Sequence, residues 1–321
     1  MPIDQATPAD DPGTPDPPDA PASPYSSRTP DALPPRPAPA DRDVIRLAYQ
    51  AQADRIYAVR RAETRDGTPS GDAGNARAEA VSSLRAAWAD HQERYPERAR
   101  ATPVTHPDNS WSSGEARRLT PDQNAAVDRG CGRIREIGER DILPAMLRIE
   151  AAAPDRRLAG LEHMLKDADR LKEKVAERLR YQPGLPPGQA VAGVPDAVRF
   201  TLEYSESHYT EGVSADIERL KEAGHELLKL KNLWAKDQYK GINSQWISSD
   251  TRLRFEVQFH TPESREAKEL THKAYERLRD PQTSKAEESA LEAYQRRVNA
   301  MIRLPPNVLT IEDYPPEKRD G

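Results

Sequence analysis

The chain has 321 residues, of which 36% are hydrophobic and 31% are charged, with a formal net charge of −5 at pH 7. A chain of this length forms one or two domains, and the low hydrophobic fraction indicates that part of it is not packed. The acidic balance excludes a globally basic coat for nucleic acid but not a local basic groove. The single cysteine, Cys131, excludes an intrachain disulfide and a cysteine-based zinc cluster.

The N-terminal segment is rich in proline. Thirteen of the 30 prolines lie within the first 40 residues, which contain no apolar run, so residues 1–41 are predicted to form a disordered tail. The first residues have neither the basic start nor the apolar core of a signal peptide, and no stretch approaches the ~18 apolar residues of a membrane span. We therefore expect a cytoplasmic protein without membrane contact, although export by another route would leave no trace in the sequence.

Residues 42–150 are predicted to form a helical N-terminal region. Apolar spacing and Gly/Pro content predict two helices, at 42–62 and 77–95, and two loops, at 64–77 and 100–119. Thr120 is a predicted N-cap, with Gln123 completing a capping box and Pro121 at the first helical position. Pro144 is expected to break or kink the helical segment that follows.

Residues 151–303 are predicted to form an α+β domain, and residues 304–321 a C-terminal tail. The predicted elements are a long helix from Pro154-Asp155 to about residue 181, a strand at 197–204, a helix at 213–223, a strand at 225–234, a hairpin of 242–247 and 252–260, a helix from Thr261 to before Asp280, and a helix at 284–301. This order predicts a mixed β-sheet flanked by helices, preceded by a helical arm and the disordered tail.

The strand at 252–260 alternates between two faces. Phe255, Val257 and Phe259 point to one face, whereas Glu256, Gln258 and His260 point to the other. A solvated outer face is the simplest interpretation of the polar side. A row that combines a carboxylate, an amide and an imidazole is also a candidate for chemistry.

Two further features have similarly simple interpretations. Asp196 begins another predicted strand, with Arg199 three residues later, and this pattern is also that of a turn residue beside a surface ion pair. Lys166, Arg170 and Lys174 share one face of the predicted long helix, which could equally be a salt-bridged solvent face. Together, however, two carboxylates on one sheet and a cationic helix are what magnesium and a polyphosphate require.

Four motifs occur in an order that resembles the synthetase domain of RelA/SpoT-like proteins. The motifs are DRLKEKVAERL, VPDAVRF, YKGINSQW and FEVQFHT. They are most similar to actinobacterial ATP nucleotide 3′-pyrophosphokinases and to RelA/SpoT-like domains of polymorphic toxins. The resemblance spans roughly residues 160–281 and implies a nucleotidyltransferase-like fold.

The resemblance also implies roles for individual residues. Asp196 and Glu256 match the magnesium ligands and catalytic acids, and Arg199 matches the strand arginine. Lys166, Arg170, Lys172 and Lys174 match the ATP-phosphate-binding helix. The residues that match the acceptor site are Tyr239, Gly241, Ile242, Ser244, Gln258 and His260. Ile242 replaces a tyrosine that stacks on guanine in guanosine-specific members, so the resemblance implies an acceptor that is not strictly guanine.

Three functions are consistent with these observations. The first is transfer of pyrophosphate from ATP to the 3′-hydroxyl of a nucleotide, with Mg²⁺ as cofactor and AMP as the leaving group. The second is a toxin that modifies an RNA 3′ end, such as that of tRNA, with the N-terminal region serving delivery or neutralisation by an antitoxin. The third is a non-catalytic nucleotide-binding module, which the retained acidic and basic positions disfavour.

Overall fold

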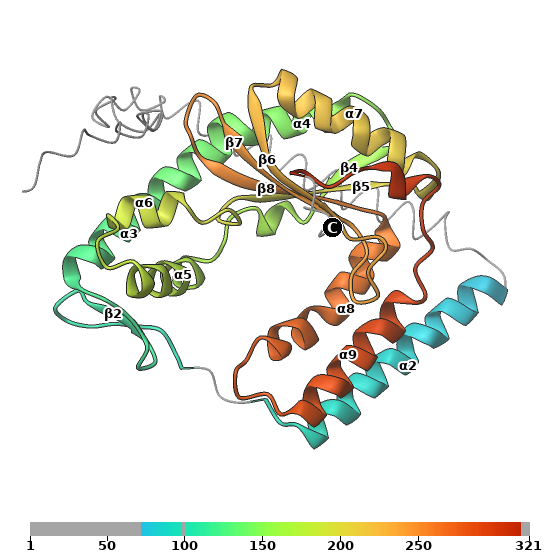
Figure 1. Ribbon diagram of the computed structural model, residues 1–321, viewed down its shortest axis with the longest axis horizontal. Coiled ribbons are helices and arrows are strands. Elements are labelled where there is room, and N and C mark those ends of the chain that lie inside the picture. Colours follow the sequence, from blue (N-terminus) through green and yellow to red (C-terminus); the bar gives the residue numbers. More distant parts are fainter. Residues whose placement is uncertain (1–71, 98–100, 316–321) are drawn as a thin grey trace, which may run out of the picture. The chain divides into compact units, whose positions relative to one another are not determined.

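Figure 1 shows the computed structural model, which describes residues 72–97 and 101–315. Its centre is a five-stranded sheet in the order β4-β5-β8-β7-β6. The strands are β4 (Arg156–Ala159), β5 (Arg199–Tyr204), β6 (His225–Asn232), β7 (Ile242–Ser248) and β8 (Arg254–His260). Strands β5 and β8 are parallel and all other neighbours are antiparallel, so the sheet is mixed.

Alternation along the three inner strands gives the sheet two different faces. Phe200 pairs with Val257, Ile242 pairs with Phe259, and all four side chains are buried on one face. Polar residues from the same strands, Glu256 among them, point to the other face. We call these the apolar face and the polar face of the sheet.

Helices cover both faces. The helices are α2 (Asp72–Arg94), α3 (Pro121–Ile137), α4 (Leu143–Ala151), α5 (Ala168–Tyr181), α6 (Pro187–Ala192), α7 (Tyr209–Glu222), α8 (Pro262–Leu278) and α9 (Lys285–Asn299). Tyr209 of α7 donates a hydrogen bond to the Phe259 carbonyl and packs edge-on against Tyr204, which places α7 on the apolar face. Helix α8 lies on the other side of the sheet (Figure 1), where Lys268 contacts the polar-face residue Gln258.

Helix α3 begins as its sequence predicts. Thr120 and Gln123 form a reciprocal capping box, with Pro121 in the first turn. A π-helical turn, Gly138–Ile142, then joins α3 to α4, with Pro144 in the first turn of α4. Because Pro144 lacks the N–H that a continuing α-helix needs, the local change in hydrogen bonding agrees with the predicted interruption.

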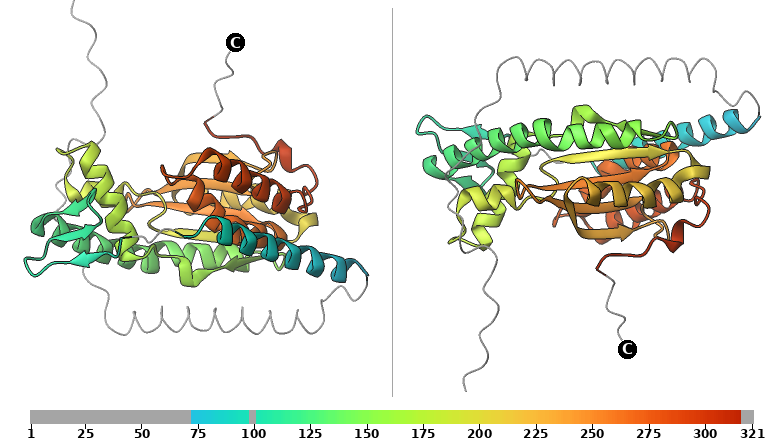
Figure 2. Two further views of the ribbon diagram at one scale, coloured as in Figure 1. Left: turned by 90° about the horizontal axis from the view of Figure 1, so that it is seen from below. Right: turned by 90° about the horizontal axis from the view of Figure 1, so that it is seen from above.

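Helix α2 and the segment near the C-terminus both pack against other elements of the described structure. Helix α2 lies beside α9, where Trp88 and Tyr294 have ring centroids 5.3 Å apart (Figure 2). Near the C-terminus, the backbone of Tyr314 exchanges hydrogen bonds with Leu230 of the edge strand β6. Part of the predicted C-terminal tail is therefore ordered on the sheet edge.

Two predicted elements differ from the structure. The predicted loop at 100–119 contains a three-stranded antiparallel sheet made of β1 (Val104–Thr105), β2 (Trp111–Ser113) and β3 (Arg117–Leu119). The first half of the predicted helix at 155–181 is strand β4 and a short 3₁₀ turn, Leu161–His163. The helix begins only at Ala168, with Asp167 as its N-cap.

The predicted α+β class, with a mixed sheet flanked by helices, is confirmed. The predicted tail at 1–41 and helix at 42–62 lie outside the described residues. Within residues 72–97 and 101–315, no helix is both long and apolar enough to cross a membrane.

Candidate active site

Backbone pairing brings Lys166 next to Asp196. Leu165 forms an antiparallel bridge with Val198, and the Lys166 N–H donates to the Ala197 carbonyl at 3.0 Å. The long predicted helix is therefore wrong at Lys166, which lies in an extended segment before α5. Asp196 likewise precedes β5 instead of beginning it. The backbone contacts between these two extended segments bring the side chains of Lys166 and Asp196 together.

Asp196 accepts hydrogen bonds from two lysines. Lys174 Nζ of α5 lies 2.7 Å from both carboxylate oxygens, and Lys166 Nζ lies 2.9 Å from Oδ2. Burial raises the pKa of Asp196, but the hydrogen bonds from Lys174 and Lys166 outweigh this effect and hold the pKa below its ordinary value. Asp196 is therefore ionised at neutral pH, as a metal ligand must be.

Two acidic residues of α5 accept hydrogen bonds from strand β2 of the small N-terminal sheet. The Trp111 indole N–H donates to Asp169 at 2.9 Å, and the Ser113 hydroxyl donates to Glu173 at 2.8 Å. Glu173 also pairs with Arg170, whose side chain is 45% exposed. Glu173 therefore contacts both β2 and Arg170, whereas Lys174 of the same helix pairs with Asp196.

Lys172 does not join this cluster. Its ammonium group lies 2.8 Å from Asp128 of α3, and its side chain is only 8% exposed. The residue therefore stabilises the contact between α3 and α5. The structure does not place Lys172 beside Asp196, unlike Lys166 and Lys174.

Glu256 lies in the middle of the polar face. It is the register partner of Arg199 on the parallel strand β5, and its N–H donates to the Val198 carbonyl at 2.9 Å. Burial raises the pKa of Glu256, the positive charge of Arg199 lowers it, and the negative charge of Asp196 raises it again, for a net increase. The negative charge of Asp196 thus acts on Glu256 in the folded protein.

Gln258 connects Glu256 to a residue that the sequence analysis did not single out. The Gln258 amide donates to Glu256 Oε1, and its carbonyl oxygen accepts a hydrogen bond from Lys268 Nζ of α8. Burial and the nearby Arg199 lower the pKa of Lys268 to about 8. The spacing from the N-cap Thr261 could have indicated Lys268, because Ser264 and Lys268 share the helix face that points toward β8.

His260 and Tyr239 form a buried network next to these residues. The Tyr239 hydroxyl lies 2.9 Å from both His260 Nε2 and Asn243 Oδ1, and His260 Nδ1 lies 2.8 Å from the Ser264 hydroxyl. Gly241 passes so close that an added Cβ would lie 2.7 Å from His260 Cε1. These contacts fix the loop before β7 against the start of α8, so His260 has a positioning role.

Ile242 and Ser244 lie on the opposite face of the sheet from Glu256. Both side chains are completely buried, and the Ser244 hydroxyl donates to the Val257 carbonyl at 2.8 Å. The structure does not bring these two predicted acceptor-binding residues into the cluster on the polar face. An acceptor preference therefore cannot be argued from the isoleucine at position 242.

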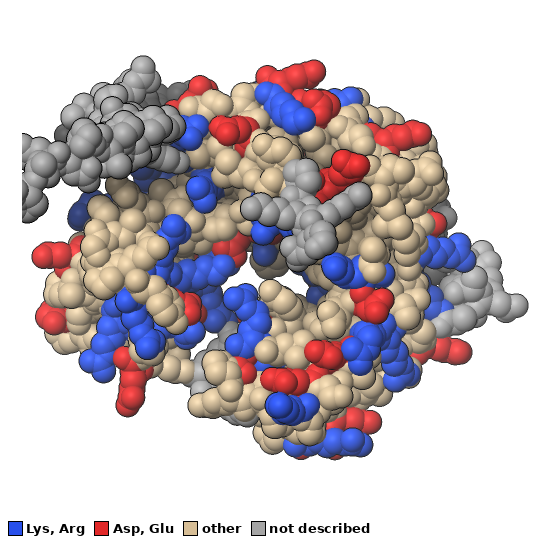
Figure 3. Space-filling model, in the orientation of Figure 1, with Lys and Arg blue, Asp and Glu red and all other residues tan. Residues whose placement is uncertain are grey.

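The site is rich in positive charge. Figure 3 shows Lys and Arg side chains gathered at the edge of an opening in the middle of the view. Five cationic residues act electrostatically on Asp196, Glu256 or Lys268: Lys166, Lys174, Arg199, Arg265 and Lys268. Such a concentration of charge suits a polyphosphate ligand.

No protein-family model and no curated protein sequence matches the chain significantly. Among solved structures, a GTP pyrophosphokinase family protein from Streptococcus pneumoniae is similar with a TM-score of 0.39 and 12% identity, over 57% of this chain and 90% of that chain. Small alarmone synthetase 1 from Bacillus subtilis, bound to its product pppGpp, has a TM-score of 0.33 and 9% identity, over 56% and 88%. Small alarmone synthetase 2 from Bacillus subtilis has a TM-score of 0.34 and 12% identity, over 54% and 90%. Similarity this low does not establish the activity of this chain.

The donor atoms at Asp196 and Glu256 fit a magnesium ion. Within the described parts of the chain, no three His, Cys, Asp or Glu side chains form a complete metal cage. Magnesium does not need one, because one or two carboxylates combine with phosphate oxygens and water to complete its shell. Burial is the main cause of the raised pKa of Glu256, and the negative charge of Asp196 adds to it, so a bound cation would offset part of this effect.

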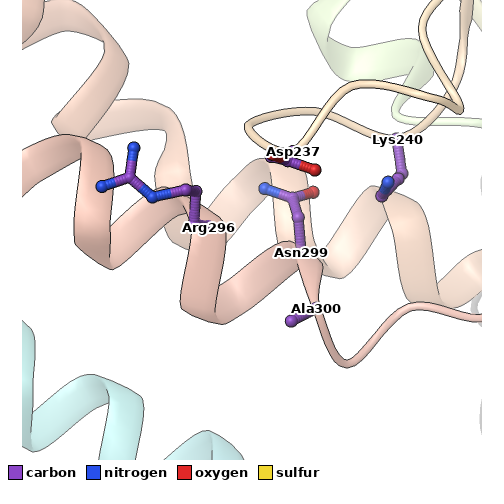
Figure 4. A pocket seen from close by; sticks show the side chains of 5 residues that line it. All are labelled: Asp237, Lys240, Arg296, Asn299 and Ala300. Carbon is purple, nitrogen blue, oxygen red and sulfur yellow. The ribbon is translucent and has the colours of Figure 1, made fainter.

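A separate small cavity lies between the loop before β7 and the end of α9. Its volume is about 180 Å³, and Asp237, Lys240, Arg296, Asn299 and Ala300 line it (Figure 4). The Lys240 ammonium group donates to the Trp234 carbonyl at 2.9 Å, which anchors the loop. None of the residues predicted from the sequence to bind substrate lines this cavity.

Proposed function

We propose that the chain transfers pyrophosphate from ATP to the 3′-hydroxyl of a nucleotide and releases AMP. The observation that carries this proposal is the pairing of Asp196 with both Lys166 and Lys174, together with the electrostatic effect of Asp196 on Glu256 of the polar face. Two carboxylates and two lysines from separate segments are the groups that phosphoryl transfer needs. The order of the four sequence motifs supports the same reading.

Asp196 and Glu256 would hold Mg²⁺, which when bound would offset negative charge on the phosphate oxygens. Glu256 Oε1 accepts the Gln258 amide, and Oε2 remains for the metal or the acceptor hydroxyl. The raised pKa of Glu256 also makes its carboxylate a better proton acceptor than an ordinary glutamate.

Lys166 and Lys174 bind the phosphates of ATP in this proposal. Without substrate, both ammonium groups donate to Asp196. When a triphosphate enters, they turn to its oxygens and leave the Asp196 oxygens for the metal. Arg170 lies four residues before Lys174 on α5, and its exposed side chain would bind the outer phosphate. Lys172 takes no part, because it is paired with Asp128.

The proposed transfer step forms one bond, breaks one bond and moves one proton. The 3′-hydroxyl oxygen forms a bond to the β-phosphorus while its proton moves to Glu256. The bond between the β-phosphorus and the oxygen that bridges to the α-phosphate breaks, and AMP leaves with the electron pair. The lysines contribute by positioning the phosphates and stabilising charge in a partly buried site.

Substitution of either carboxylate tests the proposal. Asp196→Asn and Glu256→Gln keep size and hydrogen-bonding capacity but remove a negative charge, so we expect each to lower AMP release from ATP by at least about 100-fold. Asp128→Asn is the matched control, because Asp128 pairs with Lys172 away from the site. The acceptors GDP, ADP and tRNA are compared in parallel, with γ-labelled ATP as donor. Turnover by both site variants at the rate of the control would overturn the assignment.

A further inference from the structure

Arg199 and Lys268 are two positive charges on the polar face that no carboxylate neutralises directly. In the described residues, neither forms an ion pair within 4.0 Å, whereas Lys166 and Lys174 both pair with Asp196. The hydrogen bond from Lys268 goes to the neutral amide oxygen of Gln258. Both side chains are partly buried, and Glu256 acts electrostatically on both without pairing with either, whereas Glu269, which also acts on Lys268, pairs with Arg265. Because partly buried charges in proteins are normally paired, these two residues leave the site short of an anion.

The third cationic residue near Lys268, unlike Lys268 and Arg199, has carboxylate partners. Arg265, one turn earlier on α8, pairs with the buried Glu203 and with Glu269. The excess positive charge is therefore local to Arg199 and Lys268. It is also costly, because burial and the charge of Arg199 both lower the pKa of Lys268. A cost of this kind is typical of a binding site that a ligand completes.

The position of Lys268 separates it from the two lysines that hold Asp196. Asp196 lies three residues before Arg199, which is in register with Glu256. Gln258, the contact of Lys268, lies two residues beyond Glu256, which is roughly 7 Å along an extended strand. Glu256 thus lies between one cationic group at Lys166 and Lys174 and another at Lys268.

We infer that Lys268, together with Arg199, forms a second anion subsite that binds a phosphate group of the acceptor nucleotide. The inference rests on the proposed function, in which the donor phosphates occupy the Lys166 and Lys174 side. The acceptor hydroxyl must reach the β-phosphorus beside Glu256, so the acceptor's own phosphate lies on the far side of that carboxylate. Lys268 lies on that side, and Arg199 lies beside Glu256 on the neighbouring strand β5, so the two residues supply the counter-charges for this phosphate.

Binding measurements test the inference without turnover. GDP, ADP and the nucleosides guanosine and adenosine are titrated calorimetrically into the full chain with Mg²⁺ and saturating α,β-methylene-ATP, whose α–β bridge cannot be cleaved. For Lys268→Gln we expect the Kd of the diphosphate that binds to rise about tenfold or more, because a charge-assisted hydrogen bond is lost. Nucleoside binding should be unchanged. Lys268→Arg should restore most of the diphosphate affinity.

The control is Lys273→Gln on the same helix, where the side chain is 61% exposed and pairs with Glu97. This variant should bind like the wild type. Thermal stability separates a binding role from a structural one: Lys268→Gln relieves an uncompensated charge, so its Tm should equal or exceed that of the wild type. A lower Tm with unchanged diphosphate affinity would mean that Lys268 only supports Gln258, and would overturn the inference.

Two other results would also overturn the inference. One is weaker binding of α,β-methylene-ATP, titrated alone, with unchanged binding of GDP and ADP, which would assign Lys268 to the donor. The other is that neither diphosphate binds the wild-type chain. Failure of the proposed function is a different result, namely that the wild type releases no AMP from ATP although Lys268→Gln still weakens diphosphate binding.

Discussion

At the scale of single residues, the most enclosed titratable group of the site is His260. It is fully buried and contacts Tyr239 and Ser264. Burial and the positive charges of Lys268, Arg265 and Arg199 hold the pKa of His260 well below its ordinary value of 6.5. The imidazole is therefore neutral in the folded protein at pH 7.

This burial predicts a pH dependence of stability. The unfolded chain binds a proton on His260 at a higher pH than the folded chain does, so its contribution to stability is complete above pH 6.5 and is lost as the pH falls below that value. In chemical denaturation between pH 7.5 and 5, His260→Gln should therefore show a weaker decline in unfolding free energy than the wild type. His163→Gln, whose imidazole is 76% exposed, should keep the wild-type slope. Equal slopes for wild type and His260→Gln would contradict the buried neutral state.

Residue alternation predicted the polar face of β8 correctly, since Glu256, Gln258 and His260 do lie on one side of the sheet. The assignment of Ile242 followed the motif and not the alternation of its own strand. Ile242 and Trp246 are two apolar residues four apart, and strand periodicity puts both on the apolar face. Lys268 escaped prediction because its importance depends on helix α8 folding back over β8.

At the scale of elements, the contact between β2 and α5 joins the small N-terminal sheet to the helix that carries Lys174. Trp111 is 1% exposed, and its indole N–H donates to Asp169. The sequence suggested a loop here because its strands have only two or three residues each. Their order depends on packing against α5, about 60 residues further along the chain, which local patterns do not reveal.

Trp111→Phe should destabilise the protein by about 1–3 kcal/mol, because the hydrogen bond to a charged acceptor is lost and the smaller phenyl ring fills less of the buried site. Ser112→Ala, which alters the neighbouring side chain on the other face of β2, should change stability by less than about 0.5 kcal/mol. Urea denaturation monitored by circular dichroism measures both. Equal stability of the two variants would show that the contact with Asp169 is unimportant.

The misassigned helix at 155–181 has a similar cause. Leu158, Leu161 and Leu165 recur at spacings of three and four, and the first two are buried, so the pattern fits a helix. In the structure, Leu158 pairs with Leu202 of β5, more than 40 residues away. Hydrophobic spacing identified the buried residues, whereas the strand partner that determines their conformation lies outside any local window.

At the scale of the whole described structure, α2 contributes to the same hydrophobic core as the central sheet. Leu84 is 1% exposed and belongs to the same buried cluster as residues of the sheet. Arg297 of α9 also donates to Ser83 at 3.0 Å. Helix α2 thus packs against α9, which in turn packs against α8, the helix that carries Lys268.

Leu84→Ala should therefore destabilise the protein by about 2–5 kcal/mol, the usual cost of such a cavity in a core. Ser82→Ala, an exposed position on the same helix, is the control and should have little effect. Thermal unfolding compares the two. An unchanged Tm for Leu84→Ala would mean that α2 contributes little to the stability of the helices around the site.

In the proposed reaction, the β- and γ-phosphates of ATP move together to the acceptor. The most direct measurement is the stoichiometry of products from γ-labelled ATP and the acceptor that reacts. We expect one AMP for each labelled acceptor molecule formed, and at least about 100-fold less of both products with Asp196→Asn. Formation of ADP in place of AMP, or equal AMP formation by Asp196→Asn, would contradict it.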